Sequence, residues 1–108
     1  MKIVYISGPM EGCENHNITS FQKMENYLSS KGYSVVNPFD ILVDERFKTS
    51  EKETRRDYMR KDIREITFCS SIMMLNGWSR SHGAQLERTV AIEMGLGIMY
   101  EDELNDYE

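Results

Sequence analysis

The sequence predicts an α/β fold, with a parallel sheet of four to five strands covered by helices on both faces. Short apolar runs rich in β-branched and aromatic residues recur along the chain. Segments with apolar residues at helical spacing lie between them, and no linker, repeat or low-complexity stretch interrupts the alternation. Strands joined by helices pack most simply as a parallel sheet with both faces covered, which is a Rossmann-like or flavodoxin-like three-layer sandwich.

The amino-terminal segment predicts a strand followed by a helix. Residues 2–6 (KIVYI) are β-branched and aromatic, and the SGP sequence at 7–9 ends this run because proline cannot donate a ladder hydrogen bond. Apolar residues then repeat at helical spacing as far as Leu28. Asn17 is the candidate N-cap of this helix, and Gly32 is its carboxyl-terminal stop.

The middle of the chain predicts a second strand, a loop and a second helix. YSVV at 33–36 forms the strand, and Asn-Pro at 37–38 ends it. Residues 39–51 are polar and without a clear period, which is typical of a loop. A charged helix follows over about 53–67, with an apolar side made of Met59, Ile63 and Ile66.

The last third of the chain predicts a strand, a helix and a final strand. SIMML at 71–75 is typical of a buried strand, and GWSRS at 77–81 of the turn after it. A helix then leads to the last strand, LGIMY at 96–100. In the acidic tail beyond it, only Leu104 and Tyr107 indicate packing.

Composition limits the classes of function. The chain has 108 residues, 40% hydrophobic and 29% charged, which predicts a single domain over 1–108. A net charge of -5 argues against binding to a nucleic-acid polymer, so we expect a small-molecule partner. Cys13 and Cys69 lie in no metal-ligand spacing, which predicts neither a disulfide framework nor a metal site and fits a reducing cytoplasm. No run is long enough for a membrane span, and no signal peptide is recognisable.

Glu87 stands where a helix of this kind would carry a hydrocarbon side chain. On a helical wheel it falls in the middle of the apolar stripe, and helical side chains lean toward the amino end. Its carboxylate should therefore point toward the carboxyl ends of the strands, where ligands bind in parallel sheets. The alternative is a first-turn acid that complements the helix dipole, but such a residue would prefer the solvent face. The stripe consists of Gly83, Ala84, Val90, Ala91 and Met94.

Asp62 lies at the edge of the apolar stripe of the preceding helix, whereas Asp57 is expected to point away. Two inward-leaning acids can serve as nucleophile and proton donor on the two sides of a glycosidic bond. The alternative for Asp62 is an ordinary salt bridge. Its potential partners are Lys61, Arg64 and Arg80.

Further candidates lie near the predicted strand ends, each with an alternative structural role. Ser81 is the predicted N-cap of the last helix, and Gly83 leaves backbone N–H groups accessible to an anion. Trp78 is either a packing residue at the rim or a surface on which a base stacks. Tyr5 is either core packing or a phenol that orients a carboxylate. The first loop lacks GxGxxG and is weaker evidence for binding; its candidates are Ser7, Gly8, Pro9 and Met10.

Several motifs together resemble the nucleoside 2-deoxyribosyltransferase superfamily, which includes the 2'-deoxynucleoside 5'-phosphate N-hydrolases. The chain is most similar to a small deoxyribosyltransferase-like group of bacteria and phages. The matching segments span nearly the whole chain: KIVYISGPMEG, VVNPFD, DYMRKDI, LNGWSRSHGAQLE and MGLGIMY.

The resemblance implies an N-glycosidic hydrolase or transferase that needs no metal or organic cofactor. It implies that Glu87 attacks the anomeric carbon C1' to form a covalent deoxyribosyl-enzyme, that Asp62 assists proton transfer to the leaving base, and that Tyr5 contacts the nucleophile. Gly8, Ser81 and Gly83 would approach the sugar or phosphate. Some homologous sites include residues of a neighbouring subunit, and so short a chain offers a shallow crevice, so we expect a homodimer or larger homo-oligomer.

Two positions depart from the family pattern. Glu11 stands where the hydrolases carry a basic residue for the 5'-phosphate, and Ser70 or Ser71 replaces the usual Asp at the start of the third strand. The sequence leaves open the base, the sugar, phosphate recognition, and hydrolysis against transfer. An alternative function is therefore a non-catalytic binder of nucleotides or nucleotide-derived signals on the same fold.

Overall fold

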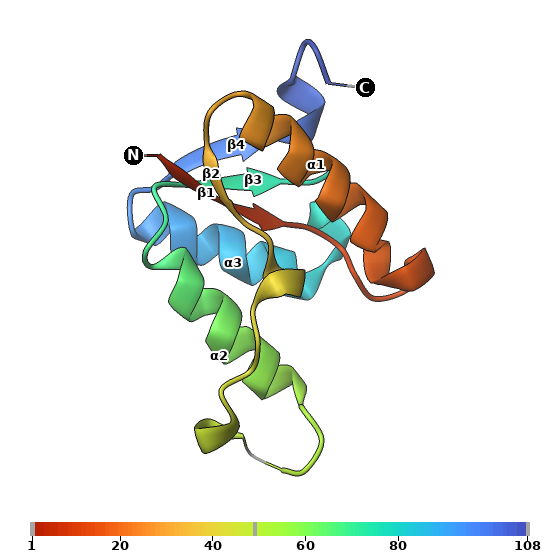
Figure 1. Cartoon of the computed structure of the whole chain (residues 1–108), viewed down its shortest axis with the longest axis vertical. Helices are drawn as coiled ribbons and strands as arrows, with labels where there is room; N and C mark the ends of the chain where they lie inside the picture. The colour runs from red at the N-terminus through yellow and green to blue at the C-terminus, as the bar shows by residue number, and fades with distance from the viewer. Residues whose placement is uncertain (1, 49, 108) are drawn as a thin grey trace.

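Four parallel strands form one sheet in the order β2-β1-β3-β4 (Figure 1). This computed structural model describes residues 2–48 and 50–107. Residues 1, 49 and 108 lie outside the described residues. All three belong to the predicted domain over 1–108, and residue 49 also belongs to the loop predicted at 39–51. The strands are β1 (Ile3–Ser7), β2 (Ser34–Val36), β3 (Ser71–Met74) and β4 (Gly97–Tyr100).

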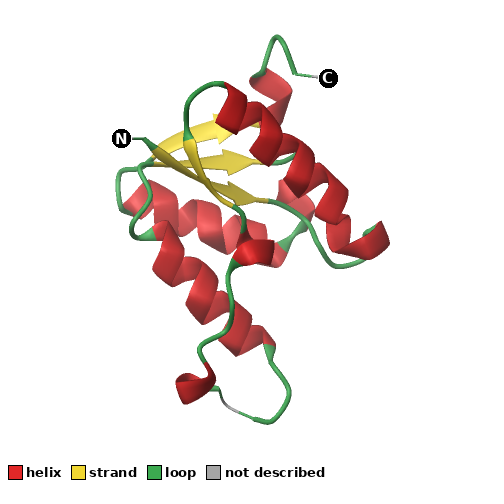
Figure 2. Ribbon diagram, in the orientation of Figure 1, coloured by secondary structure: helices red, strands yellow, loops and turns green. Residues whose placement is uncertain are grey.

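Helices cover both faces of the sheet, as Figure 2 shows. Helix α1 (Ile18–Ser30) lies on one face, and α2 (Arg55–Ile66) and α3 (His82–Glu93) lie on the other. The predicted three-layer α/β sandwich is therefore confirmed, with four strands. Among the described residues, no helix combines the length and apolarity that a bilayer span requires.

Alternation along β1 divides the core into two halves. Val4 and Ile6 pack toward α1, in a cluster with Phe21, Met24 and Leu28. Tyr5 belongs to the opposite cluster, beneath α2 and α3. Because residues two apart in a strand share a face, Ser7 should point to the same side as Tyr5.

Strand β1 runs one residue farther than the sequence predicts. Ser7 pairs with Met74 of β3, and its carbonyl accepts a hydrogen bond from Leu75 N at 2.8 Å. The turn residues therefore begin at Gly8. This extension keeps the Ser7 side chain inside the sheet layer instead of in the loop.

Both ends of α1 lie at the predicted residues, but Asn17 does not cap the helix with its side chain as predicted. At the carboxyl end, Gly32 adopts φ 92° and Tyr33 N donates to the Leu28 carbonyl at 3.2 Å, as in a Schellman motif. At the amino end, Asn17 adopts a left-handed conformation with φ 69° and makes no side-chain cap. Its amide instead donates to the Pro9 carbonyl at 2.9 Å, which ties the first loop to the helix.

The prediction that Asp57 points away from the core was wrong. Asp57 is 1% exposed, and its carboxylate accepts a hydrogen bond from Thr54 N at 2.9 Å. Thr54 accepts in return from Asp57 N, so the two residues form a capping box. Helix α2 consequently begins at Arg55, slightly later than its apolar period alone indicated.

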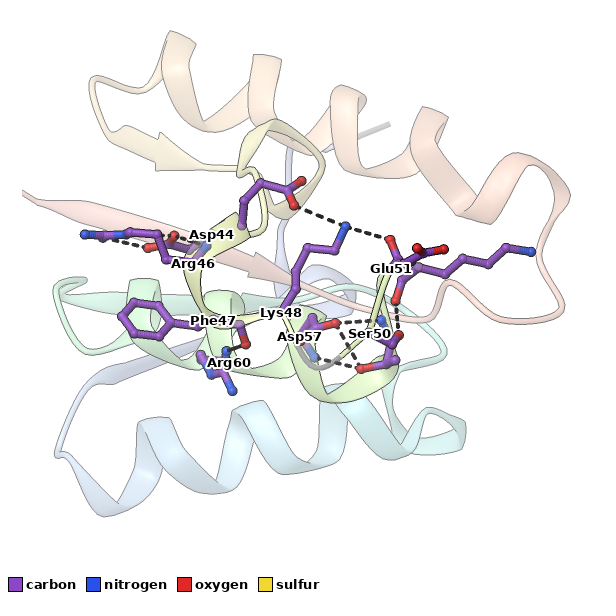
Figure 3. A network of polar contacts seen from close by, with 11 residues as sticks. Asp44, Arg46, Phe47, Lys48, Ser50, Glu51, Asp57 and Arg60 are labelled. Atoms are coloured by element: carbon purple, nitrogen blue, oxygen red, sulfur yellow. Dashed lines mark hydrogen bonds and ion pairs between the residues drawn. The ribbon is translucent and has the colours of Figure 1, made fainter.

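The predicted loop before α2 contains two short 3-10 turns and a local polar network (Figure 3). Lys48 Nζ lies 3.2 Å from the carboxylate of Glu45 and donates to the Glu51 carbonyl at 2.9 Å. Arg60 of α2 donates to the Phe47 carbonyl. These contacts hold the loop against the amino-terminal half of α2.

The acidic tail packs on α1 through the two residues that the sequence indicated. Leu104 and Tyr107 lie against the α1-side core, and the rings of Tyr107 and Tyr27 meet edge to face with centroids 5.1 Å apart. Asp106 accepts hydrogen bonds from Tyr27 Oη and Lys31 Nζ, each at 2.6 Å. The tail therefore extends the core on the face opposite α2 and α3.

Replacing Gly8 by alanine is expected to lower the free energy of unfolding by about 1–3 kcal/mol. A Cβ atom at Gly8 would lie 2.8 Å from the Cβ of Leu75, which cannot rotate away. Urea denaturation measures the effect. The matched control is Gly83→Ala, because the nearest atom to a Cβ there is Ser81 Oγ at 4.0 Å. That change should be neutral or slightly stabilising through helix propensity, and equal losses in both variants would contradict the packing argument.

Candidate active site

The carboxylate of Glu87 is held on both of its oxygens by hydroxyl groups of β1. Tyr5 Oη donates to Glu87 Oε2 at 3.1 Å, and Ser7 Oγ donates to Glu87 Oε1 at 2.6 Å. Both donors are buried, with Tyr5 0% and Ser7 1% exposed. The donors share a face because they are two residues apart in β1, and helical periodicity turns Glu87 of α3 toward that face. The predicted inward orientation of Glu87 is confirmed.

Helix α2 adds a second buried acid, Asp62, which is 9% exposed. Its Oδ1 lies 2.7 Å from Nζ of Lys61, so the predicted salt-bridge alternative is present in the structure. The Lys61 ammonium also donates to the Pro38 carbonyl at 3.0 Å. Asp62 nevertheless lies close enough to Tyr5 and Glu87 for each of these groups to influence the pKa of the others.

Burial and mutual repulsion dominate the electrostatics of the two acids. Burial, followed by the nearby charge of Asp62, raises the pKa of Glu87 to about 8, against the opposing effect of Ser7, Tyr5 and Lys61. Burial also raises the pKa of Asp62, although Lys61 opposes this. The pKa of the Tyr5 phenol lies well above its usual value because of burial and the two carboxylates. The acids therefore titrate as a pair, which favours one shared proton near neutral pH.

Replacing Glu87 by glutamine is expected to flatten the pH dependence of stability. The unfolded chain releases the Glu87 proton near 4.5, whereas the folded protein keeps it up to about 8. Between these values the folded state binds more protons, so the free energy of unfolding falls as pH rises, by at most about 1.4 kcal/mol per pH unit. Glu87→Gln has no such proton to lose.

Urea denaturation at pH 5, 6.5 and 8 would measure this difference. The exposed Glu93 lies on the same helix, and Glu93→Gln should keep the slope of the unmodified protein. Glu87→Gln should gain stability relative to the unmodified protein as pH rises. Parallel pH dependences for Glu87→Gln and the unmodified protein would contradict the raised pKa.

Two loops meet above this site at the carboxyl edge of the sheet. One follows β1 and the other follows β3, and the helices that they enter lie on opposite faces. Gly77 has φ 89°, and a Cβ atom there would lie 3.2 Å from both Pro9 Cγ and Arg80 Nη2. This is the topological switch point of the sheet, the position at which ligands generally bind in open α/β folds.

The predicted binding residues of the first loop differ in their burial and contacts. Ser7 is buried beneath the loop, and its hydroxyl donates a hydrogen bond to Glu87. Met10 packs, partly buried, against the α1-side core. Gly8 lies against Leu75, and Pro9 contacts the region of Gly77. Gly8 and Pro9 therefore both approach the loop that follows β3.

The predicted binding residues around the start of α3 lie at the switch point. Ser81 accepts a hydrogen bond from Ala84 N at 3.2 Å, which confirms it as the N-cap. Outside the backbone of the helix itself, no atom lies closer than 4.0 Å to a Cβ atom placed at Gly83. The Trp78 ring lies 5.9 Å from that of Tyr100, and the Arg88 guanidinium stacks over it at 4.8 Å. These contacts favour the rim-packing interpretation of Trp78, while substrate contact by all three residues stays a prediction.

Glu87 lines neither of two hollows on the surface of residues 2–48 and 50–107. One hollow, of about 90 Å³, lies between the loop at 41–47 and α2. The other, of about 320 Å³, is formed by Glu14, Asn15, Asn17 and Thr19 of the first loop and the start of α1. A nucleotide-sized hollow at Glu87 therefore does not correspond to either of them.

Sequence reasoning missed the role of Ser7 and did not choose among the possible partners of Asp62. The strand period contained a signal for Ser7, because a serine two residues after Tyr5 shares its face. No comparable signal distinguished Lys61 from the arginines. Ser70 and Ser71, which stand where the resemblance predicts an aspartate, lie at the opposite edge of the sheet. There Ser70 Oγ accepts from Ile3 N at 2.9 Å and donates to the Ile3 carbonyl at 3.0 Å.

Comparison with curated proteins finds no match to this sequence. A family model described as "Domain of unknown function (DUF4406)" matches residues 2–100. The matched range includes all four strands, the three helices and the site residues Tyr5, Asp62 and Glu87. That description names no activity, so the resemblance to deoxyribosyltransferases stays a prediction. Over nearly its whole length, the chain belongs to the DUF4406 family.

Proposed function

We propose that this protein cleaves the N-glycosidic bond of a deoxynucleoside or deoxynucleoside monophosphate, with Glu87 as nucleophile and Asp62 as acid and base. One observation carries the proposal: a carboxylate held on both oxygens by buried hydroxyls lies in the electrostatic range of a second buried acid. Glycosidic chemistry requires a pair of carboxyl groups, of which one is ionised and attacks while the other is protonated and acts as the acid. The position of the pair below the switch point of the sheet also supports a ligand site.

The proposed reaction has two steps. In the first, the proton shared by the pair moves from Glu87 to Asp62, an oxygen of Glu87 bonds to C1' of the sugar, the bond from C1' to the base nitrogen breaks, and Asp62 transfers the proton to the departing base. In the second, water or a second base attacks C1', Asp62 takes the proton of that nucleophile, and Glu87 is released. Water yields hydrolysis and a second base yields transfer.

Tyr5 and Ser7 contribute by orientation in this mechanism. Their hydroxyls bind the two oxygens of Glu87 and limit rotation of its carboxylate. A nucleophile held in one orientation reaches C1' without the entropy cost of ordering a free side chain. Partial burial limits the access of water to Glu87, which would otherwise weaken its interaction with the positive charge that develops at C1'.

Substrate access needs a change at the mouth of the site, because Tyr5 and Ser7 are buried and Glu87 is only partly exposed. We propose that the loops after β1 and β3 move apart to admit the sugar and that a second subunit walls the opened crevice. Equilibrium sedimentation tests the oligomer, and a monomer at working concentration would count against it. The free thiols of Cys13 and Cys69 support the proposal of a reducing, cytoplasmic location.

Incubation with a panel of deoxynucleosides, ribonucleosides and their monophosphates tests the activity. Chromatography should detect free base, and with a second base present it should detect the exchanged nucleoside. The first product identifies hydrolysis and the second identifies transfer. Absence of both products across the panel would overturn the proposal.

The second candidate function is a non-catalytic nucleotide binder. It is favoured by the exposed Glu11 in the first loop and by Ser70 and Ser71, which stand where the deoxyribosyltransferase pattern has an aspartate. For this function, nucleotides should raise the melting temperature and be recovered intact after long incubation. Recovery of free base would reject it.

A further inference from the structure

Lys61 is a nearly buried cation that makes contacts on two sides. Its side chain is 11% exposed, and its ammonium lies 2.7 Å from Asp62 Oδ1. The same ammonium donates to the carbonyl of Pro38 at 3.0 Å, in the segment that follows β2. Lys61 therefore connects α2 to the segment that follows β2. It is also adjacent in sequence to Asp62, one member of the acid pair.

The charges of these groups balance in only one protonation state. Lys61 contributes one positive charge, and Asp62 with Glu87 contributes two, one or no negative charges as protons are added. Net charge in a buried site is costly, so the state with one proton on the acid pair, which sums to zero, is the favoured one. This is also the state that glycosidic chemistry needs, with one carboxylate to attack and one carboxyl group to donate a proton.

We propose that Lys61 is a positioning residue that holds Asp62 beside Glu87 and keeps the acid pair in its one-proton state. Its effect on the protonation of the pair stands independently, while its catalytic consequence rests on the proposed glycosidic function. Without Lys61, the one-proton state would carry an uncompensated negative charge, and the pair would take up a second proton more readily. The attacking carboxylate would then be lost at higher pH than in the unmodified protein.

Other titratable groups face this cluster from each element around it. Tyr5 comes from β1 and Glu87 from α3, and Cys69, which follows α2, lies close enough to influence Tyr5. The hollow that Lys61 lines on its other side contains both signs of charge, so it offers no net cation to replace Lys61. Its charged residues are Asp44, Asp57, Arg60, Arg64 and Glu65.

Carbon-13 NMR titration of the side-chain carboxyl groups tests the proposal without any substrate. In Lys61→Met, the titration steps of Asp62 and Glu87 should move to higher pH by about one to three units, because an opposite charge at close range has been removed. Lys61→Arg keeps the charge and should restore most of the original titration. Lys52→Met removes a cation from an exposed position and should leave both steps unchanged.

Unchanged steps in a folded Lys61→Met protein, or an equal shift in Lys52→Met, would overturn the proposal. If Lys61→Met does not fold, the unmodified protein decides, because the pair should bind one proton near pH 7, and two protons or none would contradict the charge balance. Once a substrate is known, the acid limb of the kcat profile should move upward in Lys61→Met and return in Lys61→Arg. Titration shifts in a protein without base release would reject the proposed function and leave the role of Lys61 intact.

Discussion

Replacing Glu87 by alanine is expected to lower base release by about 10,000-fold or more, the scale of loss seen when an enzyme loses its nucleophile. The variant keeps the fold but has no carboxylate to bond to C1'. Tyr5 and Ser7 would lose their shared acceptor, so a thermal melt is needed to confirm that the variant is folded. Chromatography of the free base under single-turnover conditions measures the rate.

Azide offers a sharper test of the same position. In Glu87→Ala a small anion can occupy the vacated space and attack C1', so that a glycosyl azide forms as the base leaves with the proton of Asp62. Rescue by azide, with opposite anomeric configuration to the product of the unmodified protein, is the expected result. The control Glu93→Gln changes an exposed acid on the same helix and should be fully active. Similar losses in Glu93→Gln, or undiminished release in Glu87→Ala, would exclude Glu87 as the nucleophile.

Replacing Asp62 by asparagine is expected to slow release of an ordinary base by about 100- to 10,000-fold, the usual contribution of acid catalysis. Asparagine preserves the shape of the side chain but cannot transfer a proton to the leaving nitrogen. Lys61 would also lose its anionic partner, so a thermal melt is needed to confirm the fold. The rate of base release by chromatography measures the effect.

The size of this effect should depend on the leaving group. A deoxyriboside with nitrophenolate as leaving group needs no proton to depart, so Asp62→Asn should form the covalent intermediate from it at nearly the normal rate. Asp102→Asn, which changes an exposed acid in the tail, serves as the control and should behave as the unmodified protein. An equal loss on both kinds of substrate would mean that Asp62 supports the structure and does not act as the acid.

Local periodicity explains why much of the fold and part of the site could be predicted. Each strand and helix has its own apolar pattern, and the capping role of Ser81 follows from its place before α3. The same helical periodicity predicted that Glu87 faces the sheet. The prediction that Asp57 points away from the core failed because its side chain forms a capping box, and the apolar pattern does not specify hydrogen-bond partners.

The contacts of the site were less predictable because they join distant parts of the chain. Ser7 and Glu87 are 80 residues apart, and Tyr5 and Glu87 are 82 apart. The position of Ser7 in β1 depended on the strand running one residue farther, through its pairing with Met74. Lys61 was one of three possible partners for Asp62, and only its placement near the end of β2 distinguished it.

The sequence by itself determined the order of strands and helices along the chain, the apolar faces that they bury, and the inward orientation of Glu87. These features follow from residue spacing within single elements. Tertiary structure decided which hydroxyls hold the carboxylate, that Lys61 accompanies Asp62, and that the acids titrate together. The physical reason is that hydrogen-bond partners and desolvation depend on distances between elements, which arise only when the sheet and its two helical layers pack together.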